Sequence, residues 1–154
     1  MKTYVDANAL IRLYLNLDGG SELDAALKSV EGRRAWPLPA PRLLQLEVVN
    51  GIHRMVFESR SGGQWRATPE SAACALANFE ADLDAELFLL RSPIELADVA
   101  AEFHSLAARH TASHGFRTYD LIHVASAVTL RCRRFLSFDT KANALAKLVG
   151  LETI

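Results

Sequence analysis

The chain has 154 residues, with 17 Lys and Arg against 18 Asp and Glu, so its formal net charge is −1. This balance excludes a protein that is held on nucleic acid by bulk positive charge alone. Domains usually span about 100–200 residues, so we expect a single domain over 1–154. No apolar run approaches the roughly 20 residues of a membrane span, and Asp6 interrupts the N-terminal apolar stretch, unlike a signal peptide. We therefore expect a cytoplasmic protein with reduced cysteines.

Strand and helix signals alternate through the first half of the chain. Apolar residues at helical spacing define the helices, and short apolar runs define the strands. Ser21 is a predicted N-cap, and the prolines at 37, 39 and 41 are expected to stop a strand. The predicted elements are a strand at 2–5, helices at 7–17 and 21–30, a strand at 33–38 and a helix at 41–58.

The same alternation continues to the C-terminus. Ser92, Pro93 and Glu95 predict a helix start with a capping box, and Gly150 predicts a helix end. The predicted elements are helices at 69–83 and 93–110, strands at 87–90, 134–138 and 151–154, and helices at 118–132 and 140–149. Alternating strands and helices imply parallel pairing. We expect a three-layer α/β/α sandwich with a central, mostly parallel sheet.

Four acidic residues adjoin apolar sequence rather than a solvated helix face. Asp6 and Asp139 end predicted strands, whereas Glu47 and Asp120 lie near predicted helix starts. All four positions belong to the edge of a parallel sheet where ligands bind. Carboxylates gathered there need protons or a cation, and Mg²⁺ prefers such oxygen ligands. Each aspartate is equally explained as a helix N-cap, so these residues alone indicate no more than a possible acidic site.

The order of four motifs resembles that of PIN-domain ribonucleases, and of VapC-type toxins among them. The first motif is Tyr4–Ile11, in which a strand ends in an aspartate with a small polar residue two positions later. The second is Leu46–Asn50, with its helical glutamate. The third, Arg117–Ala127, has the form D-x-x-H-x-A, and the fourth, Phe135–Asp139, ends in Ser-x-Asp. The resemblance covers essentially the whole chain.

The resemblance implies a Mg²⁺- or Mn²⁺-dependent endoribonuclease that is held inactive by a cognate VapB-type antitoxin and assembles as a homodimer. The residues at the family's metal-site positions are Asp6, Glu47, Asp120 and Asp139. The residues at supporting positions are Asn8, Ser137, Asn143 and His123. We interpret His123 as a structural histidine near the site, in preference to a general base. Lys141, two residues after Asp139, is a candidate phosphate ligand.

The chain departs from the family pattern at 62–69, a segment that contains Trp65. We interpret this segment as a surface insertion, in preference to a part of the RNA groove or a partner contact. Trp36, beside Pro37, is interpreted as a packing residue. Two other functions stay open. A phosphoacceptor receiver domain also has strand-end aspartates, but it needs an acidic pair after its first strand, and Ala7 follows Asp6 here. The other alternative is a degenerate PIN domain that binds without cleaving.

Overall fold

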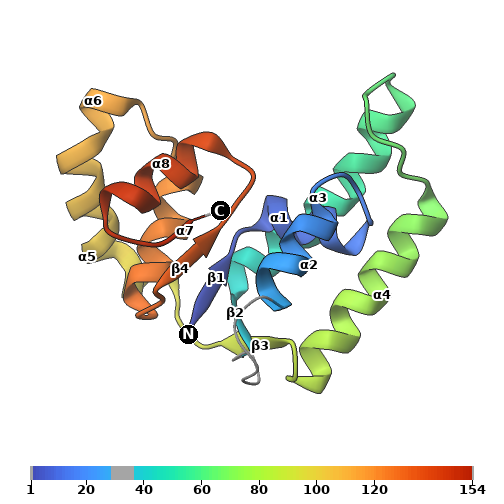
Figure 1. Ribbon diagram of the computed structural model, residues 1–154, viewed down its shortest axis with the longest axis horizontal. Coiled ribbons are helices and arrows are strands. Elements are labelled where there is room, and N and C mark those ends of the chain that lie inside the picture. The colour runs from blue at the N-terminus through green and yellow to red at the C-terminus, as the bar shows by residue number, and fades with distance from the viewer. Residues whose placement is uncertain (1, 29–36, 154) are drawn as a thin grey trace.

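Short strands alternate with longer helices along the chain (Figure 1). The structure is a computed structural model that describes residues 2–28 and 37–153. The elements of the first part are β1 (Thr3–Val5), α1 (Ala7–Tyr14), α2 (Gly20–Lys28), β2 (Leu38–Pro41), α3 (Arg42–Arg60) and α4 (Pro69–Ala85). Those of the second part are β3 (Leu89–Ser92), α5 (Leu96–Leu106), a π-helical turn η1 (Ala107–Thr111), α6 (Ala112–His114), α7 (Thr118–Thr129), β4 (Arg134–Leu136) and α8 (Thr140–Leu148).

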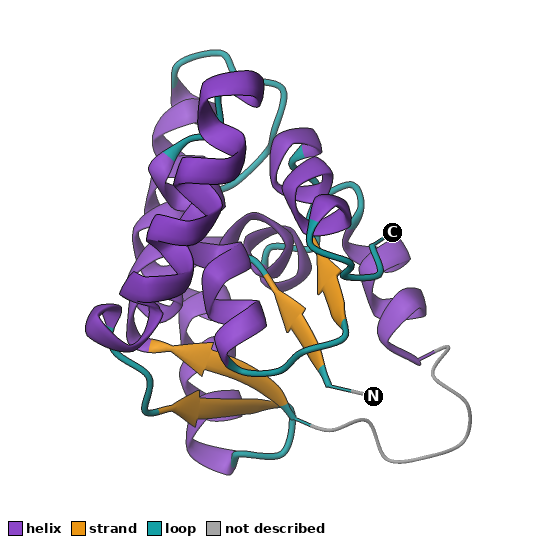
Figure 2. Cartoon of the chain, turned by 90° about the vertical axis from the view of Figure 1, so that its left-hand side faces the viewer, coloured by secondary structure: helices purple, strands orange, loops and turns teal. Residues whose placement is uncertain are grey.

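All strand pairs among the described residues are parallel. β1 pairs with β4, so that Val5 lies opposite Leu136, and β2 pairs with β3, so that Leu38 lies opposite Leu89. Figure 2 shows these two pairs pointing in different directions. The parallel pairing confirms the predicted α/β class, although the ladders form two two-stranded units rather than one continuous sheet.

Two prolines explain where the sheet divides. The N–H of Leu38 donates to Phe88 O at 2.8 Å, so this side of β2 faces β3. Because N–H groups alternate along a strand, Pro39 and Pro41 face away from β3, and proline has no N–H to donate. The prediction that prolines stop this strand was therefore wrong for Pro39, which lies inside β2 on the side where the ladder with β3 needs no donor, whereas Pro41 is the last residue of the strand.

Helices cover both faces of the strands and complete the three layers. In Figure 1, α1 to α4 lie on one side of β1 and β4, and α5, α7 and α8 lie on the other. The rings of Tyr4 and Phe135 stack across β1 and β4 with centroids 5.8 Å apart, and both side chains are fully buried. Helices α1 and α3 approach closely, since a Cβ on Gly51 would collide with Ile11. This approach places α1 against the middle of α3.

The predicted boundaries at Ser92 and at 151–154 need correction, and other predicted residues fall outside the described part of the chain. Ser92 is not a cap, because its backbone pairs in β3. Glu95 is the N-cap of α5, and its N–H donates to Asp98 Oδ2 at 2.7 Å. The strand expected at 151–154 shrinks to one bridge between Glu152 and Arg134. Most of the strand predicted at 33–38, the end of the helix predicted at 21–30, and Trp36 lie outside the described residues.

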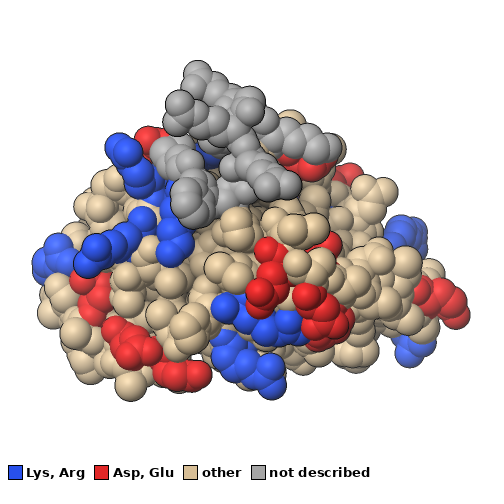
Figure 3. All heavy atoms as spheres, turned by 90° about the horizontal axis from the view of Figure 1, so that it is seen from below, with Lys and Arg blue, Asp and Glu red and all other residues tan. Residues whose placement is uncertain are grey.

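No helix among the described residues is long and apolar enough to cross a membrane. Both cysteines are free: Cys74 is exposed and Cys132 is buried. Burial raises the pKa of Cys132 to about 11. On the face shown in Figure 3, basic and acidic side chains lie side by side in small groups, as the near-neutral net charge leads one to expect.

Candidate active site

Asp6 and Asp139 each end a strand and begin a helix. Asp6 follows β1, and its Oδ1 accepts the N–H of Ala9 at 2.9 Å in the first turn of α1. Asp139 follows β4, and its Oδ1 accepts the N–H groups of Lys141 at 2.8 Å and Ala142 at 3.2 Å. Since β1 and β4 are parallel neighbours, both carboxylates lie at one edge. The cap function does not exclude a site function, because the second oxygen of each carboxylate faces away from its helix amides.

Asp120 and Glu47 reach the same edge from two other helices. Asp120 lies in the first turn of α7, and its Oδ2 accepts the backbone N–H of Arg117 at 2.9 Å. Glu47 lies in α3, where its Oε2 atom is buried and makes no hydrogen bond of good geometry. A buried carboxylate oxygen without a hydrogen bond is costly unless another partner or a cation offsets its charge.

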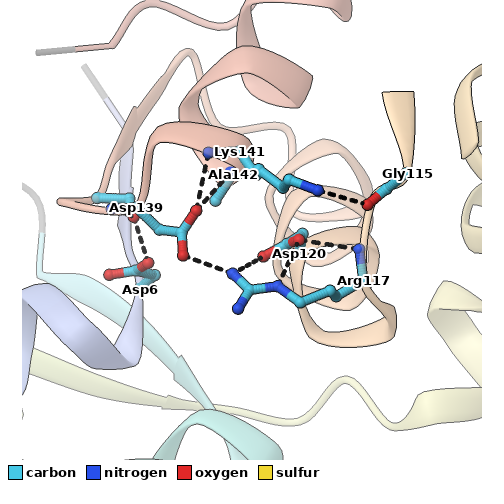
Figure 4. Close-up of polar contacts among 8 residues, drawn as sticks. Asp6, Gly115, Arg117, Asp120, Asp139, Lys141 and Ala142 are labelled. Atoms are coloured by element: carbon cyan, nitrogen blue, oxygen red, sulfur yellow. Dashed lines mark hydrogen bonds and ion pairs between the residues drawn. The ribbon is translucent and has the colours of Figure 1, made fainter. Parts of the chain in front are cut away.

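One cavity of about 220 Å³ joins the predicted site residues. Its walls include Asp6, Glu47, Asp120 and Asp139, together with Asn8, Arg117 and His123. Figure 4 shows Asp6, Asp120 and Asp139 pointing toward one another from three separate segments of the chain. The structure thus brings all four predicted acids to the wall of a single cavity.

Arg117 is the cation that compensates two of these acids. Its Nη2 lies 2.6 Å from Asp139 Oδ2 and 3.3 Å from Asp120 Oδ1, and its Nε lies 3.3 Å from Asp120 Oδ2. Burial raises the pKa of Asp139, but backbone hydrogen bonds from Ala142 and Lys141 and the ion pair with Arg117 together lower it below its ordinary value. Arg117 was missed from the sequence, although its position one helical turn before Asp120 is a spacing typical of ion pairs.

Ser137 holds Asp6 and Asp139 by hydrogen bonds, and Asn143 in turn holds Ser137. The Ser137 hydroxyl donates to Asp6 Oδ2 at 2.5 Å and accepts the N–H of Asp139 at 2.8 Å. The Asn143 side-chain amide donates to Ser137 O at 2.8 Å. Burial raises the pKa of Asp6 above its ordinary value, while His123, the Ser137 hydroxyl and the Ala9 N–H oppose that rise. Ser137 therefore links the two strand-end aspartates directly.

His123 connects Glu47 to the core of the protein. Its Nε2 lies 2.5 Å from Glu47 Oε2, and its Nδ1 lies 2.9 Å from the Tyr4 hydroxyl. Burial raises the pKa of Tyr4 far above its ordinary value, and the carboxylates of Asp6 and Glu47 add to that rise, so Tyr4 is a neutral phenol. In the tautomer with its proton on Nε2, the imidazole faces Glu47 with an N–H and accepts the proton of the Tyr4 hydroxyl at Nδ1. Tyr4 was not predicted as a site residue, because its position within β1 looks like that of any core aromatic.

Three further residues from the sequence analysis, Asn8, Lys141 and Trp65, differ in their exposure and in their contacts. Asn8 is exposed and lines the wall. The Nζ of Lys141 donates to Gly115 O at 2.9 Å, which ties the start of α8 to the turn before α7 (Figure 4). Trp65 in the 62–69 segment is half-buried rather than a free surface group, and the centre of the Arg12 guanidinium lies 5.0 Å from its ring centroid.

The donor set fits a hard divalent cation in its chemistry. Carboxylate oxygens are the ligands that Mg²⁺ and Mn²⁺ take in proteins, and the buried Oε2 of Glu47 lies against His123 Nε2 without hydrogen-bond geometry. Across residues 2–28 and 37–153, however, no three His, Cys, Asp or Glu side chains lie close enough to hold an ion as they stand. Arg117 separates Asp120 and Asp139, so an ion shared by these acids would take over the charge compensation that the guanidinium supplies.

The comparison with protein families agrees with this arrangement. Residues 3–148 match the PIN domain, a span that includes all four acids. Proteins with this domain are typically metal-dependent nucleases that use divalent ions such as Mg²⁺ or Mn²⁺. A comparison with curated proteins finds no match. The receiver-domain alternative has no support from these findings. The chain belongs to the PIN domain family.

Proposed function

We propose that this chain is a Mg²⁺- or Mn²⁺-dependent endoribonuclease of the VapC toxin type. The observation that supports the proposal most strongly is that four acids from four separate places in the sequence line one cavity: Asp6, Glu47, Asp120 and Asp139. Asp6 and Asp139 also cap α1 and α8 at this edge, but capping does not explain why Glu47 and Asp120 join them, and the mutual repulsion of four carboxylates disfavours the arrangement. A cation-dependent site gives a reason for it.

In this proposal Asp6, Glu47, Asp120 and Asp139 would hold the ion, and the ion would supply an activated water and a positive charge beside the phosphodiester oxygens. Ser137 fixes Asp6 and Asp139 relative to each other through its two short hydrogen bonds. His123 orients the Glu47 carboxylate from its position between Tyr4 and Glu47. Lys141 uses one of its three ammonium donors on Gly115, which leaves two donors for a phosphate of the substrate.

A cleavage assay on purified protein tests the activity. Wild-type protein should cut single-stranded RNA in Mg²⁺ or Mn²⁺ and should leave DNA of the same sequence intact. Cleavage should stop when EDTA removes the metal. Asp120→Asn should lose cleavage. The matched control is Asp84→Asn, which removes an exposed carboxylate paired with Arg91 and should cut at the wild-type rate. Equal cleavage by both variants would reject the site, and cleavage in EDTA would reject the metal requirement.

We further propose that a VapB-type antitoxin neutralises the enzyme in the cytoplasm. A groove of about 410 Å³ between α3 and α4 is lined by Val56, Phe57 and Leu76, and Phe57 is 68% exposed. An amphipathic helix of a partner would fit such an apolar groove. Expression of the chain alone should arrest host growth, and co-expression of a small protein from the neighbouring reading frame should restore it. Arrest that no neighbouring product relieves would remove the toxin–antitoxin assignment while leaving the nuclease intact.

A second apolar surface supports the proposed homodimer. Leu46 on α3 and Leu96 on α5 are each more than half exposed, and with Ile94 they line one hollow of about 170 Å³. Apolar side chains that gather on one face favour a self-complementary contact between two copies. Light scattering on the purified chain should give about twice the monomer mass of 16.9 kDa.

A further inference from the structure

A larger cavity opens directly beside the carboxylate cavity. It measures about 540 Å³ and lies against α1 and α3 and beside Trp65. The two cavities share Asn8, Glu47 and Tyr119 in their walls. A volume of roughly 300–1,000 Å³ is typical of ligand pockets. A polymer held at the carboxylates would therefore place its neighbouring unit in the larger cavity.

Arg12 supplies a positioned cation to this cavity. The centre of its guanidinium lies 5.0 Å from the centroid of the Trp65 ring and 4.6 Å from that of Phe138, so two aromatic rings hold it. Its Nη1 makes a long hydrogen bond to Asp18 O at 3.4 Å. A guanidinium has five N–H donors, so Arg12 keeps most of its donors for a ligand. Arg54 also lines the cavity, but it is paired with Glu58 at 3.0 Å.

Hydrogen bonds between α3 and the 62–69 segment hold Trp65 at the wall of the cavity. The Ser59 hydroxyl in α3 lies 2.8 Å from Trp65 O and 2.7 Å from Met55 O, and it accepts the N–H of Ala67 at 2.8 Å. One side chain therefore ties the backbone of Trp65 and of Ala67, two residues later, to α3. Because Trp65 also contacts Arg12, the segment holds an aromatic face at the cavity.

The cavity lining offers three kinds of side-chain group that can bind a nucleotide. Trp65 and the exposed Tyr119 offer aromatic faces on which a base can stack, and Arg12 offers donors for a phosphate or a base edge. The exposed amides of Asn8 and Asn50 offer both donors and acceptors. A purely apolar cavity would suit a protein side chain better, whereas this mixture matches single-stranded RNA.

We propose that this cavity is a nucleotide subsite, which holds the RNA residue next to the scissile phosphate and sets a sequence preference at that position. The proposal rests on the nuclease function proposed above. In it, a base stacks on the aromatic wall formed by Trp65 and Tyr119, and the Arg12 guanidinium contacts the adjoining phosphate. The 62–69 segment is then a part of the substrate groove.

The test measures binding separately from cleavage. Fluorescently labelled hexanucleotides of A, C or U are titrated in EDTA, and anisotropy reports affinity without turnover. Trp65→Ala should weaken binding by roughly tenfold or more, the size expected for one base–aromatic stack, and Trp65→Phe should retain most of it. Arg12→Met, which keeps an unbranched apolar stem between the rings, should weaken binding and lower its salt dependence. The matched control is Phe57→Ala, an exposed aromatic outside this cavity, and it should bind as wild type does.

Mapping the cut sites in Mg²⁺ completes the test. If the subsite exists, Trp65→Ala should still cut but with a higher KM and a relaxed preference at one position beside the cut. Unchanged affinity and cut sites in both Trp65→Ala and Arg12→Met would overturn the subsite even though the nuclease stands. A loss of antitoxin binding in these variants with normal RNA binding would also overturn it. Absence of cleavage in the wild type itself would instead reject the nuclease function.

Discussion

The Nη2 atom of Arg117 lies 2.6 Å from Oδ2 of Asp139, across 22 residues of sequence. The same guanidinium contacts Asp120, so one exposed side chain ties together two of the four acids. A divalent cation and this guanidinium would therefore compete for the same carboxylates. Arg117 is 63% exposed, so it can turn outward into water without breaking the core.

Replacing Arg117 with glutamine should strengthen metal binding. Exposed ion pairs contribute about 0.2–1 kcal/mol each, so removing this competitor should raise the affinity for Mn²⁺ about two- to tenfold in calorimetric titrations. The backbone N–H of residue 117 that caps α7 is kept in Arg117→Gln. Arg109→Gln, which removes an exposed partner of Glu102, is the control and should leave metal affinity unchanged. Weaker metal binding in Arg117→Gln would mean that Arg117 supports the site rather than opposing the ion.

Asp6→Asn should raise stability without metal and abolish the response to metal. The substitution removes a buried charge, whose burial raises the pKa of Asp6, and asparagine remains a good N-cap. In EDTA the variant should have a higher Tm than wild type. For a chain of this size, a gain of about 1 kcal/mol in the free energy of unfolding raises the Tm by roughly 2–4 °C. Added Mn²⁺ should raise the Tm of wild type and leave that of Asp6→Asn unchanged.

The informative result is the comparison of the two Tm values under both conditions: Asp6→Asn should melt above wild type in EDTA but should not gain the increase in Tm that Mn²⁺ gives to wild type. A variant that was merely misfolded would melt lower under both conditions. If Mn²⁺ raised the Tm of Asp6→Asn as much as that of wild type, Asp6 would not be a metal ligand.

Tyr4→Phe should lower cleavage more than its loss of stability explains. The change deletes the hydroxyl that contacts His123 Nδ1 at 2.9 Å, and an unpaired buried polar atom costs about 1–3 kcal/mol. Since His123 orients Glu47, kcat should fall severalfold while the KM for RNA stays near wild type. Tyr14→Phe is the control, because its hydroxyl donates to Asp82 at 2.6 Å outside the site. It should lose stability and keep kcat, and an equal fall in kcat for both variants would refute the positioning role.

Leu46→Asp combined with Leu96→Asp should convert the proposed dimer to a monomer. Both leucines are exposed in one copy of the chain, so the charges cost little in the monomer and oppose burial between two copies. Light scattering should give 16.9 kDa for the double variant, with an unchanged circular dichroism spectrum. Phe57→Asp lies on the other apolar groove and should remain dimeric. A double variant that stayed dimeric would place the interface elsewhere.

Much of the fold and site could be predicted because the acids occupy positions that local sequence defines. Asp6 and Asp139 follow apolar runs that become β1 and β4, and the N-cap geometry of both follows from their place before a helix. Glu47 and Asp120 stand out by their apolar neighbours near predicted helix starts, and the order of the motifs assigns all four acids to one site. These positions depend on contacts of short range along the chain, which sequence patterns describe well.

The parts that were missed depend on contacts across the fold. Tyr4 and His123 are 119 residues apart, and no local pattern links them. Arg117 meets Asp139 only after α7 and α8 pack together. Ser92 has a favourable capping sequence, but pairing with β2 places it in a strand, because a ladder satisfies its backbone better than an isolated cap.

The prolines of β2 have a consequence beyond the strand itself. Asp6 and Asp139 belong to the β1–β4 pair, whereas Glu47 belongs to the helix that follows β2, which pairs with β3. Pro39 and Pro41 offer no backbone donor on the side away from β3, so side-chain packing must set the distance between Glu47 and the aspartates. An ion bound by both groups would act as a cross-link between the two strand pairs. Amide hydrogen exchange in β1 and in β3 would then slow together when metal is added.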